Sequence, residues 1–69
     1  MKLYWPVAEY QKDGREDKIW TYNACTSMAE AQNVFASWAE TYDLTRTFVE
    51  VYEGERKKIV EVELPNPSV

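Results

Sequence analysis

The feature that most restricts the fold of this chain is a single helix-forming segment between two pairs of strand-forming segments. Apolar side chains of the 28–42 segment recur at helical spacing and fall on one stripe, made of Met28, Ala31, Phe35, Trp38, Ala39 and Tyr42. Ser27 and Glu30 have the spacing of a capping box, with Ser27 as the N-cap. We therefore predict one amphipathic helix over residues 28 to 42.

The first pair of strands flanks Asp13-Gly14, a dipeptide that favours a two-residue hairpin turn. We predict strands over residues 3–10 and 17–24. With these two residues as the turn, the predicted pairs are Glu9 with Lys18, Val7 with Trp20, Trp5 with Tyr22 and Leu3 with Ala24. Because Pro6 has no N–H to donate to a ladder, we expect the 3–10 strand to be an edge strand or to be irregular at Pro6.

The second pair of strands covers residues 45–52 and 57–64, where apolar and polar residues alternate. A two-residue turn at Glu53-Gly54 would pair Arg46 with Glu61, Phe48 with Ile59 and Glu50 with Lys57. A four-residue loop would keep the same faces, whereas a three-residue loop would flip one strand relative to the other. The 65–69 tail contains two prolines and is predicted to be frayed.

The order ββαββ predicts one α+β domain over residues 1–64, with two layers: a four-stranded antiparallel sheet and one helix packed on one face. The strand order stays open between 2-1-3-4 and 1-2-4-3. The helix can cover only one side of the sheet. The predicted core beneath it consists of Leu3, Trp5, Val7, Trp20, Tyr22, Val49, Val51, Val60, Val62 and Leu64.

The other face of the sheet is then rich in apolar and aromatic residues. We predict an interaction face made of Tyr4, Tyr10, Ile19, Phe48, Tyr52 and Ile59. Monomers rarely expose a continuous apolar patch of more than a few hundred Å². We therefore expect this face to bind a partner protein or a second copy of the chain as a homodimer. The alternative, ordinary cross-strand pairs on a solvated sheet, stays open.

Composition removes most catalytic chemistry. The 69 residues include no histidine and one cysteine, which excludes an intrachain disulfide, a zinc site with the usual Cys and His ligands, and Ser-His or Cys-His catalytic pairs. The carboxylates follow the pattern of a solvated strand face. We predict no catalytic residue, no metal site, no cofactor and no small-molecule substrate, so the chain is not expected to be an enzyme. Cys25 precedes the predicted helix, whose dipole could lower the pKa of a thiol there, but a buried filler is the favoured interpretation.

Charge and hydropathy bear on partners and location. Twelve acidic and eight basic residues give a net charge of −4, an acidic balance that disfavours nucleic acids and anionic membranes. The alternative function is a nucleic-acid-associated protein that stacks bases on sheet aromatics beside Arg46 and Lys57. Pairing of these two cations with Glu61 and Glu50 would instead favour a protein partner. The absence of a spanning segment or signal peptide, with one cysteine, predicts a cytoplasmic protein.

Part of the chain resembles a family of small uncharacterised accessory proteins of bacteria and their phages. The resemblance covers residues 4–42 and depends on Tyr4-Trp5, Asp13-Gly14, Asn23-Ala24-Cys25, Ser27, Glu30-Ala31, Trp38 and Tyr42. Those proteins commonly continue as helix or coil after the tryptophan, whereas this chain adds a second hairpin. The family has no assigned activity, so the resemblance implies only an accessory protein of a mobile element, acting as an adaptor or inhibitor through protein contact.

Overall fold

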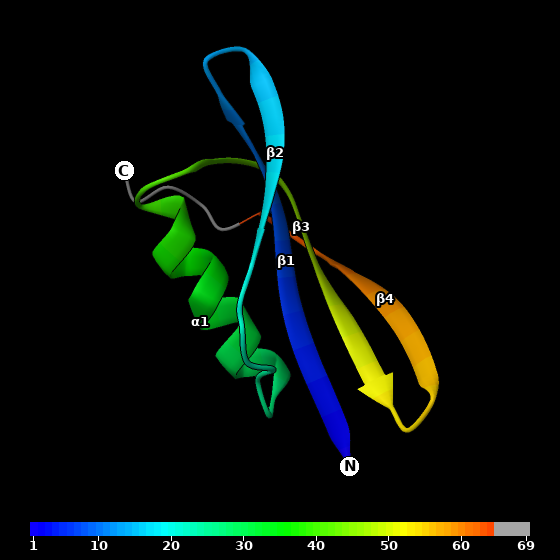
Figure 1. The fold of residues 1–69 in the computed structure, drawn as a ribbon. Coiled ribbons are helices and arrows are strands. Elements are labelled where there is room, and N and C mark those ends of the chain that lie inside the picture. Colours follow the sequence, from blue (N-terminus) through cyan, green and yellow to red (C-terminus); the bar gives the residue numbers. More distant parts are fainter. Residues whose placement is uncertain (65–69) are drawn as a thin grey trace.

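The computed structural model describes residues 1–64 and contains four strands and one helix. These are β1 (Lys2–Lys12), β2 (Arg15–Trp20), α1 (Met28–Ala39), β3 (Asp43–Glu53) and β4 (Arg56–Val62). The strands form one antiparallel sheet in the order β2-β1-β3-β4, and α1 packs across one side of it (Figure 1). The predicted two-layer ββαββ architecture is confirmed, with the 2-1-3-4 order. The predicted frayed tail, residues 65–69, lies outside the described residues.

The helix begins where the capping signal places it. Ser27 Oγ accepts a hydrogen bond of 3.1 Å from the backbone N–H of Glu30. The Glu30 carboxylate in turn accepts bonds from the backbone N–H and the hydroxyl of Thr26, at 3.2 and 2.9 Å. The helix ends at Ala39, three residues before the predicted end. The N–H groups of Thr41 and Tyr42 bond the Trp38 carbonyl in a final turn.

The first hairpin has the predicted turn and register. Asp13 and Gly14 both adopt positive φ, at 54° and 77°, as the type I′ turn requires. Val7 lies opposite Trp20 and Glu9 opposite Lys18. Because β2 ends at Trp20, the predicted pairs of Trp5 with Tyr22 and Leu3 with Ala24 are wrong. The chain returns to β1 five residues later, where Cys25 and Tyr4 exchange two backbone hydrogen bonds of 2.9 and 2.7 Å.

Pro6 lies in an interior strand, because β1 is between β2 and β3. Tyr4 directs its N–H and C=O to Cys25, and alternate residues of a strand direct these groups to the same side. The Pro6 nitrogen therefore points into the gap between the Cys25 bridge and the end of β2, where a donor is not required. The prediction of an edge strand is wrong. The ladder with β2 stops at Val7, next to Pro6, but Pro6 itself pairs with Val49, and the register irregularity of β1 lies between Glu9 and Tyr10.

The second hairpin turns at Gly54-Glu55 rather than at Glu53-Gly54. Gly54 has φ 62° at the first turn position, as the type II′ turn requires. The partners shift by two residues, so that Glu61 lies opposite Phe48, Ile59 opposite Glu50 and Lys57 opposite Tyr52. The predicted direct pairs of Phe48 with Ile59, Arg46 with Glu61 and Glu50 with Lys57 are wrong. The faces are kept, because the shift is an even number of residues.

The pairing of β1 with β3 determines which faces of the two hairpins coincide. Val7 lies opposite Phe48 and Trp5 opposite Glu50, so these four residues share one side of the sheet. The other side faces α1. There the core cluster consists of Ala8, Cys25, Ala31, Phe35 and Val49, with Tyr4, Ile19, Met28, Val34, Trp38, Leu44, Val51 and Val62 packed against it.

The predicted core is therefore largely right for the second hairpin, whereas in the first hairpin only Val7 is buried, and it lies on the side away from the helix. Val49, Val51 and Val62 lie under the helix, and Val60 lies opposite Val49. Leu3, Trp5, Val7 and Trp20 lie on the side that α1 does not cover. Tyr22 and Leu64 are 98% and 41% exposed, so they are not core residues either. Ala8 and Ala31 are wholly buried between sheet and helix, which shows that the two layers meet through small side chains.

Candidate interaction surface

The side of the sheet that α1 leaves uncovered is called the open face here. By strand register it carries Leu3, Trp5, Val7, Glu9 and Gln11 of β1, Glu16, Lys18 and Trp20 of β2, Arg46, Phe48, Glu50 and Tyr52 of β3, and Lys57, Ile59 and Glu61 of β4. Apolar and aromatic side chains occupy its middle, and charged side chains lie mostly around them. The open face is thus the part of the described sheet that is available to a partner.

The structure brings together only three of the six residues predicted for the interaction face. Phe48, Tyr52 and Ile59 lie on the open face. Tyr4 and Ile19 instead pack against the core cluster beneath α1. Tyr10 lies on the helix side as well, with its ring 4.7 Å from that of Tyr42, and burial is the main cause that raises its pKa. The prediction that all six share one face is wrong.

Five residues that the sequence did not indicate for this surface take their place: Leu3, Trp5, Val7, Trp20 and Tyr22. All five belong to the core that the sequence predicts, because they share one face of the predicted first hairpin. The signal that could have identified them is the pair of small residues Ala8 and Ala31. A helix approaches a sheet most closely where side chains are small, and Ala8 has the opposite orientation to Val7 on β1.

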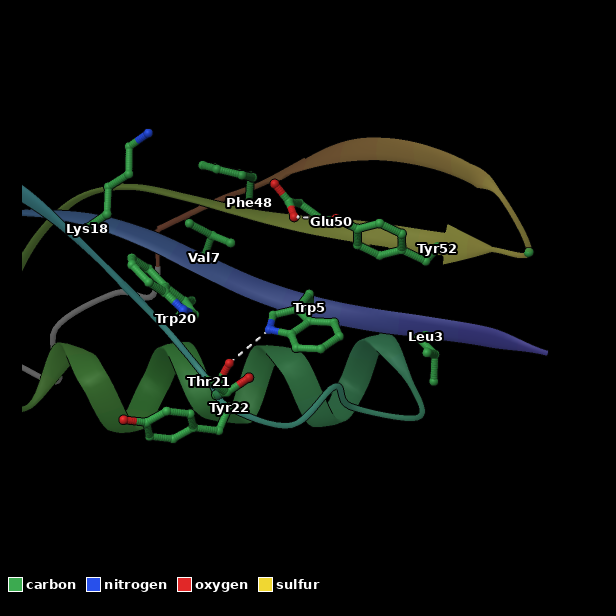
Figure 2. Close-up of a pocket in the computed structure, with 11 residues that line it drawn as sticks. Leu3, Trp5, Val7, Lys18, Trp20, Thr21, Tyr22, Phe48, Glu50 and Tyr52 are labelled. Atoms are coloured by element: carbon green, nitrogen blue, oxygen red, sulfur yellow. Dashed lines mark hydrogen bonds between the residues drawn. The ribbon is translucent and has the colours of Figure 1, made fainter.

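A groove of about 640 Å³ runs along the open face. Figure 2 shows side chains of β1, β2 and β3 around it, with Trp5 near its centre. Val7 and Phe48, only 8% and 6% exposed, form its floor, while Trp20 and Tyr22 are 61% and 98% exposed. The other lining residues are Leu3, Trp5, Lys18, Thr21, Glu50, Tyr52 and Gly54. The groove therefore combines a packed apolar floor with accessible aromatic rings.

Hydrogen bonds hold two of these rings in place. The indole Nε1 of Trp5 donates to the carbonyl oxygen of Thr21 at 2.8 Å, the bond drawn as a dashed line in Figure 2. Trp5 also meets Tyr52 edge to face, with ring centroids 6.2 Å apart. The Tyr52 hydroxyl donates to Glu50 Oε1 at 3.0 Å, and this hydrogen bond is the main cause that raises the pKa of Tyr52. Such rings lose little side-chain freedom when a ligand binds.

The charges of the open face are nearly balanced, and Arg46 pairs with two of its carboxylates. Arg46 donates from Nε to Glu61 at 3.1 Å and from a terminal nitrogen to Glu9 at 3.2 Å. Its guanidinium carbon also lies 4.5 Å from the centre of the Phe48 ring. The hydrogen bond from Arg46 lowers the pKa of Glu61. The four acidic residues of this face are Glu9, Glu16, Glu50 and Glu61, and the three basic residues are Lys18, Arg46 and Lys57, so most of the net charge of −4 comes from elsewhere.

Cys25 is buried in the core cluster, with 4% of its surface exposed. Burial raises the pKa of its thiol, and the charge of Glu30 adds to the effect. The suggested depression by the helix dipole is therefore wrong for this thiol, whose surroundings are those of a packing residue. Within residues 1–64, no three side chains among His, Cys, Asp and Glu gather closely enough to hold a metal ion.

Comparison of the chain with protein-family models, curated proteins and solved structures finds no match. In the described part of the chain, α1 is too short to cross a membrane. The functional interpretation therefore depends on the open face and its groove.

Proposed function

We propose that this protein is a small non-enzymatic interaction module, an adaptor or an inhibitor, that binds a segment of another protein on its open face. The observation that carries the proposal is the groove of about 640 Å³, in which accessible tryptophan and tyrosine rings surround a packed apolar floor. An accessory role in a mobile element, implied by the sequence resemblance, stays a prediction.

The chemistry of the groove favours an apolar peptide segment as the ligand. Trp and Tyr are the side chains that most often dominate the binding energy at protein interfaces. A volume of this size accommodates a few side chains, and the polar groups at its rim, Lys18 and Glu50, can orient a peptide backbone. We expect an extended segment that inserts two or three apolar side chains beside Trp5 and Trp20.

The same residues give little support to the nucleic-acid alternative. Binding to phosphates requires free cations, and Arg46 is already hydrogen-bonded to Glu61 and Glu9. Lys57 lies opposite Tyr52 on β4, beyond the groove. A net charge of −4 opposes the approach of a polyanion. A protein ligand is therefore the better-supported proposal.

Peptide display against the immobilised protein tests this function. We expect selected peptides to share apolar residues and to lose at least about tenfold in affinity for Tyr22→Ser, a change of about 1.4 kcal/mol. Tyr22 lines the groove yet is 98% exposed, so this substitution should not alter folding. Gln32→Ser on the exposed side of α1 is the matched control and should bind normally.

Two results would contradict the proposal. One is a peptide set that binds Tyr22→Ser and the wild type equally. The other is a single-stranded oligonucleotide that binds the wild type with an affinity that falls steeply with salt, as counterion release requires. The second result would support the nucleic-acid alternative.

A further inference from the structure

The outer edge of β4 is the second surface of the sheet available for contact. β4 is the last strand in the order β2-β1-β3-β4, and within residues 1–64 nothing pairs with its outer side (Figure 1). An uncovered edge presents a row of backbone donors and acceptors to any strand of matching pattern. The side chains on that edge decide which strand matches.

The register of the sheet shows which residues of β4 have outward backbone groups. Tyr4 exchanges both backbone bonds with Cys25, so even-numbered residues of β1 face β2 and odd-numbered residues from Leu3 to Glu9 face β3. The β3 residues opposite these odd-numbered β1 residues are even-numbered, so the odd-numbered residues of β3 direct their backbone N–H and C=O groups to β4. There Val49 pairs with Val60, and Val51 pairs with Lys58. The outward groups of β4 therefore belong to Lys57, Ile59 and Glu61.

These three residues form a self-complementary pattern, with a cation and an anion at equal distances on either side of an apolar residue. We infer that a second copy of this chain pairs with β4 in antiparallel orientation, with the two-fold axis at Ile59. Lys57 then lies opposite the partner's Glu61, and Glu61 lies opposite the partner's Lys57. Each of the three pairs exchanges two backbone bonds, about six in all. Such an isologous contact closes as a dimer.

The charge pattern selects this register over its neighbours. A slip of two residues in either direction places Ile59 opposite one of the charged residues and breaks both ion pairs. A slip of one residue would place residues whose backbone N–H and C=O groups point toward β3 opposite the outward groups of the partner strand, so the two β4 strands could not hydrogen-bond there. In the proposed register each cross-strand ion pair makes a modest contribution to the stability of the dimer.

The opposite edge of the sheet does not match itself in this way. By the same register its outward groups belong to Glu16, Lys18 and Trp20 of β2. Asp17 Oδ1 accepts a hydrogen bond of 2.8 Å from the backbone N–H of Lys18. The central backbone donor of that edge is therefore already hydrogen-bonded. Pairing centred on Lys18 would also bring two lysines together, and pairing centred on Asp17 would bring two carboxylates together. The β4 edge is therefore the one suited to a second copy.

The inferred dimer contains one continuous sheet with twice the strands of a single chain. Ile59 lies on the open face of each copy, and directly opposed residues share a face, so both open faces lie on the same side. The two grooves, each centred on β1, are separated by five strand spacings, about 24 Å. The inference does not depend on what the grooves bind.

The first test is concentration-dependent hydrogen exchange. A single strand pair buries less than the roughly 800 Å² per partner of a standard interface, so we expect a dimer that dissociates at micromolar to millimolar concentration. Sedimentation should show this equilibrium. The amides of Lys57, Ile59 and Glu61 should gain protection as concentration rises, while those of Glu16 and Trp20 should not. A chain that stays monomeric at millimolar concentration would overturn the inference.

The second test compares two charge reversals on adjacent residues. Lys57→Glu places carboxylates opposite each other at both ends of the junction and should raise the dissociation constant at least about tenfold. Lys58→Glu makes the same change in net charge, but residue 58 has inward backbone groups and would lie opposite the partner's Val60. It should stay within about threefold of the wild type.

Mixing two charge-reversed variants distinguishes the inferred strand register from a general effect of net charge on association. Lys57→Glu and Glu61→Lys should each associate poorly alone, yet a mixture should form heterodimers, because every cross-strand pair is then oppositely charged. Equal weakening by Lys57→Glu and Lys58→Glu would overturn the inference. A dimer lost in Tyr22→Ser, without protection of the three amides, would place the contact on the open face and would also overturn it.

Discussion

The strongest prediction about this fold is that its two phenylalanines, both buried, differ sharply in their contribution to stability. Phe35 of α1 is 1% exposed and lies between helix and sheet, whereas Phe48 of β3 is 6% exposed at the floor of the groove. Exposure alone would make them equivalent. The difference arises from what replaces each ring when it is truncated.

Truncation of Phe35 leaves an enclosed cavity, so Phe35→Ala should lose both the transfer free energy and the cavity contribution, about 3–5 kcal/mol. Truncation of Phe48 opens a space into the groove, which water can enter. Phe48→Ala should therefore lose mainly the transfer free energy, about 1.5–3 kcal/mol. For a domain of this length the whole free energy of unfolding is about 3–10 kcal/mol, so Phe35→Ala is expected to be largely unfolded at room temperature.

Urea unfolding followed by far-ultraviolet circular dichroism measures both effects, at one low protein concentration for all variants. If Phe35→Ala does not fold, Phe35→Leu and Phe48→Leu are compared instead, with the larger loss again expected at Phe35. A difference of 1 kcal/mol shifts the melting temperature of a domain this small by about 4–8 °C. Equal losses at the two positions would refute the assignment of one enclosed and one open face.

Three smaller predictions concern the helix cap, the thiol and the open-face ion pairs. Ser27→Ala should lower the free energy of unfolding by about 0.5–2 kcal/mol in the same urea assay, because the Glu30 N–H loses its acceptor. Cys25 should react slowly with a thiol reagent at neutral pH, since it is buried and its pKa is raised; rapid labelling of the folded chain would contradict this. Arg46 lowers the pKa of Glu61, so the pair stabilises the fold above the ordinary glutamate pKa, and this contribution is lost as pH falls through the lowered value. Glu61→Gln should therefore lose less stability on acidification than the wild type.

Local signals predicted local structure well in this chain. Asp13-Gly14 determined both the turn and the register of the first hairpin, because two consecutive positive φ values suit this dipeptide better than most others. Ser27 determined the start of the helix for a similar reason, since its hydroxyl satisfies a backbone donor within the same turn. In both cases the deciding interaction lies within a few residues.

The choice of face could not be made in this way. In the first hairpin both faces are apolar: Leu3, Trp5 and Val7 alternate with Tyr4, Pro6 and Ala8. The alternation therefore does not indicate which face packs against the helix, and the sequence prediction places the set with Leu3, Trp5 and Val7 in the core. The deciding contact is the non-local pairing of β1 with β3, which places Val7 opposite Phe48. Close approach of α1 then favours the set that contains Ala8.

The second turn shows how one residue changes the chemistry of a sheet edge. A turn at Glu53-Gly54 would direct the backbone groups of residues 58, 60 and 62 outward, and Lys58, Val60 and Val62 contain no acid to balance the lysine. Gly54 instead takes the first turn position with φ 62°, so that Glu53 and Arg56 flank the turn and every β4 partner shifts by two residues. The outward set becomes Lys57, Ile59 and Glu61, whose charges complement those of a second copy. The self-complementary edge is thus a consequence of the conformation that glycine adopts at the turn.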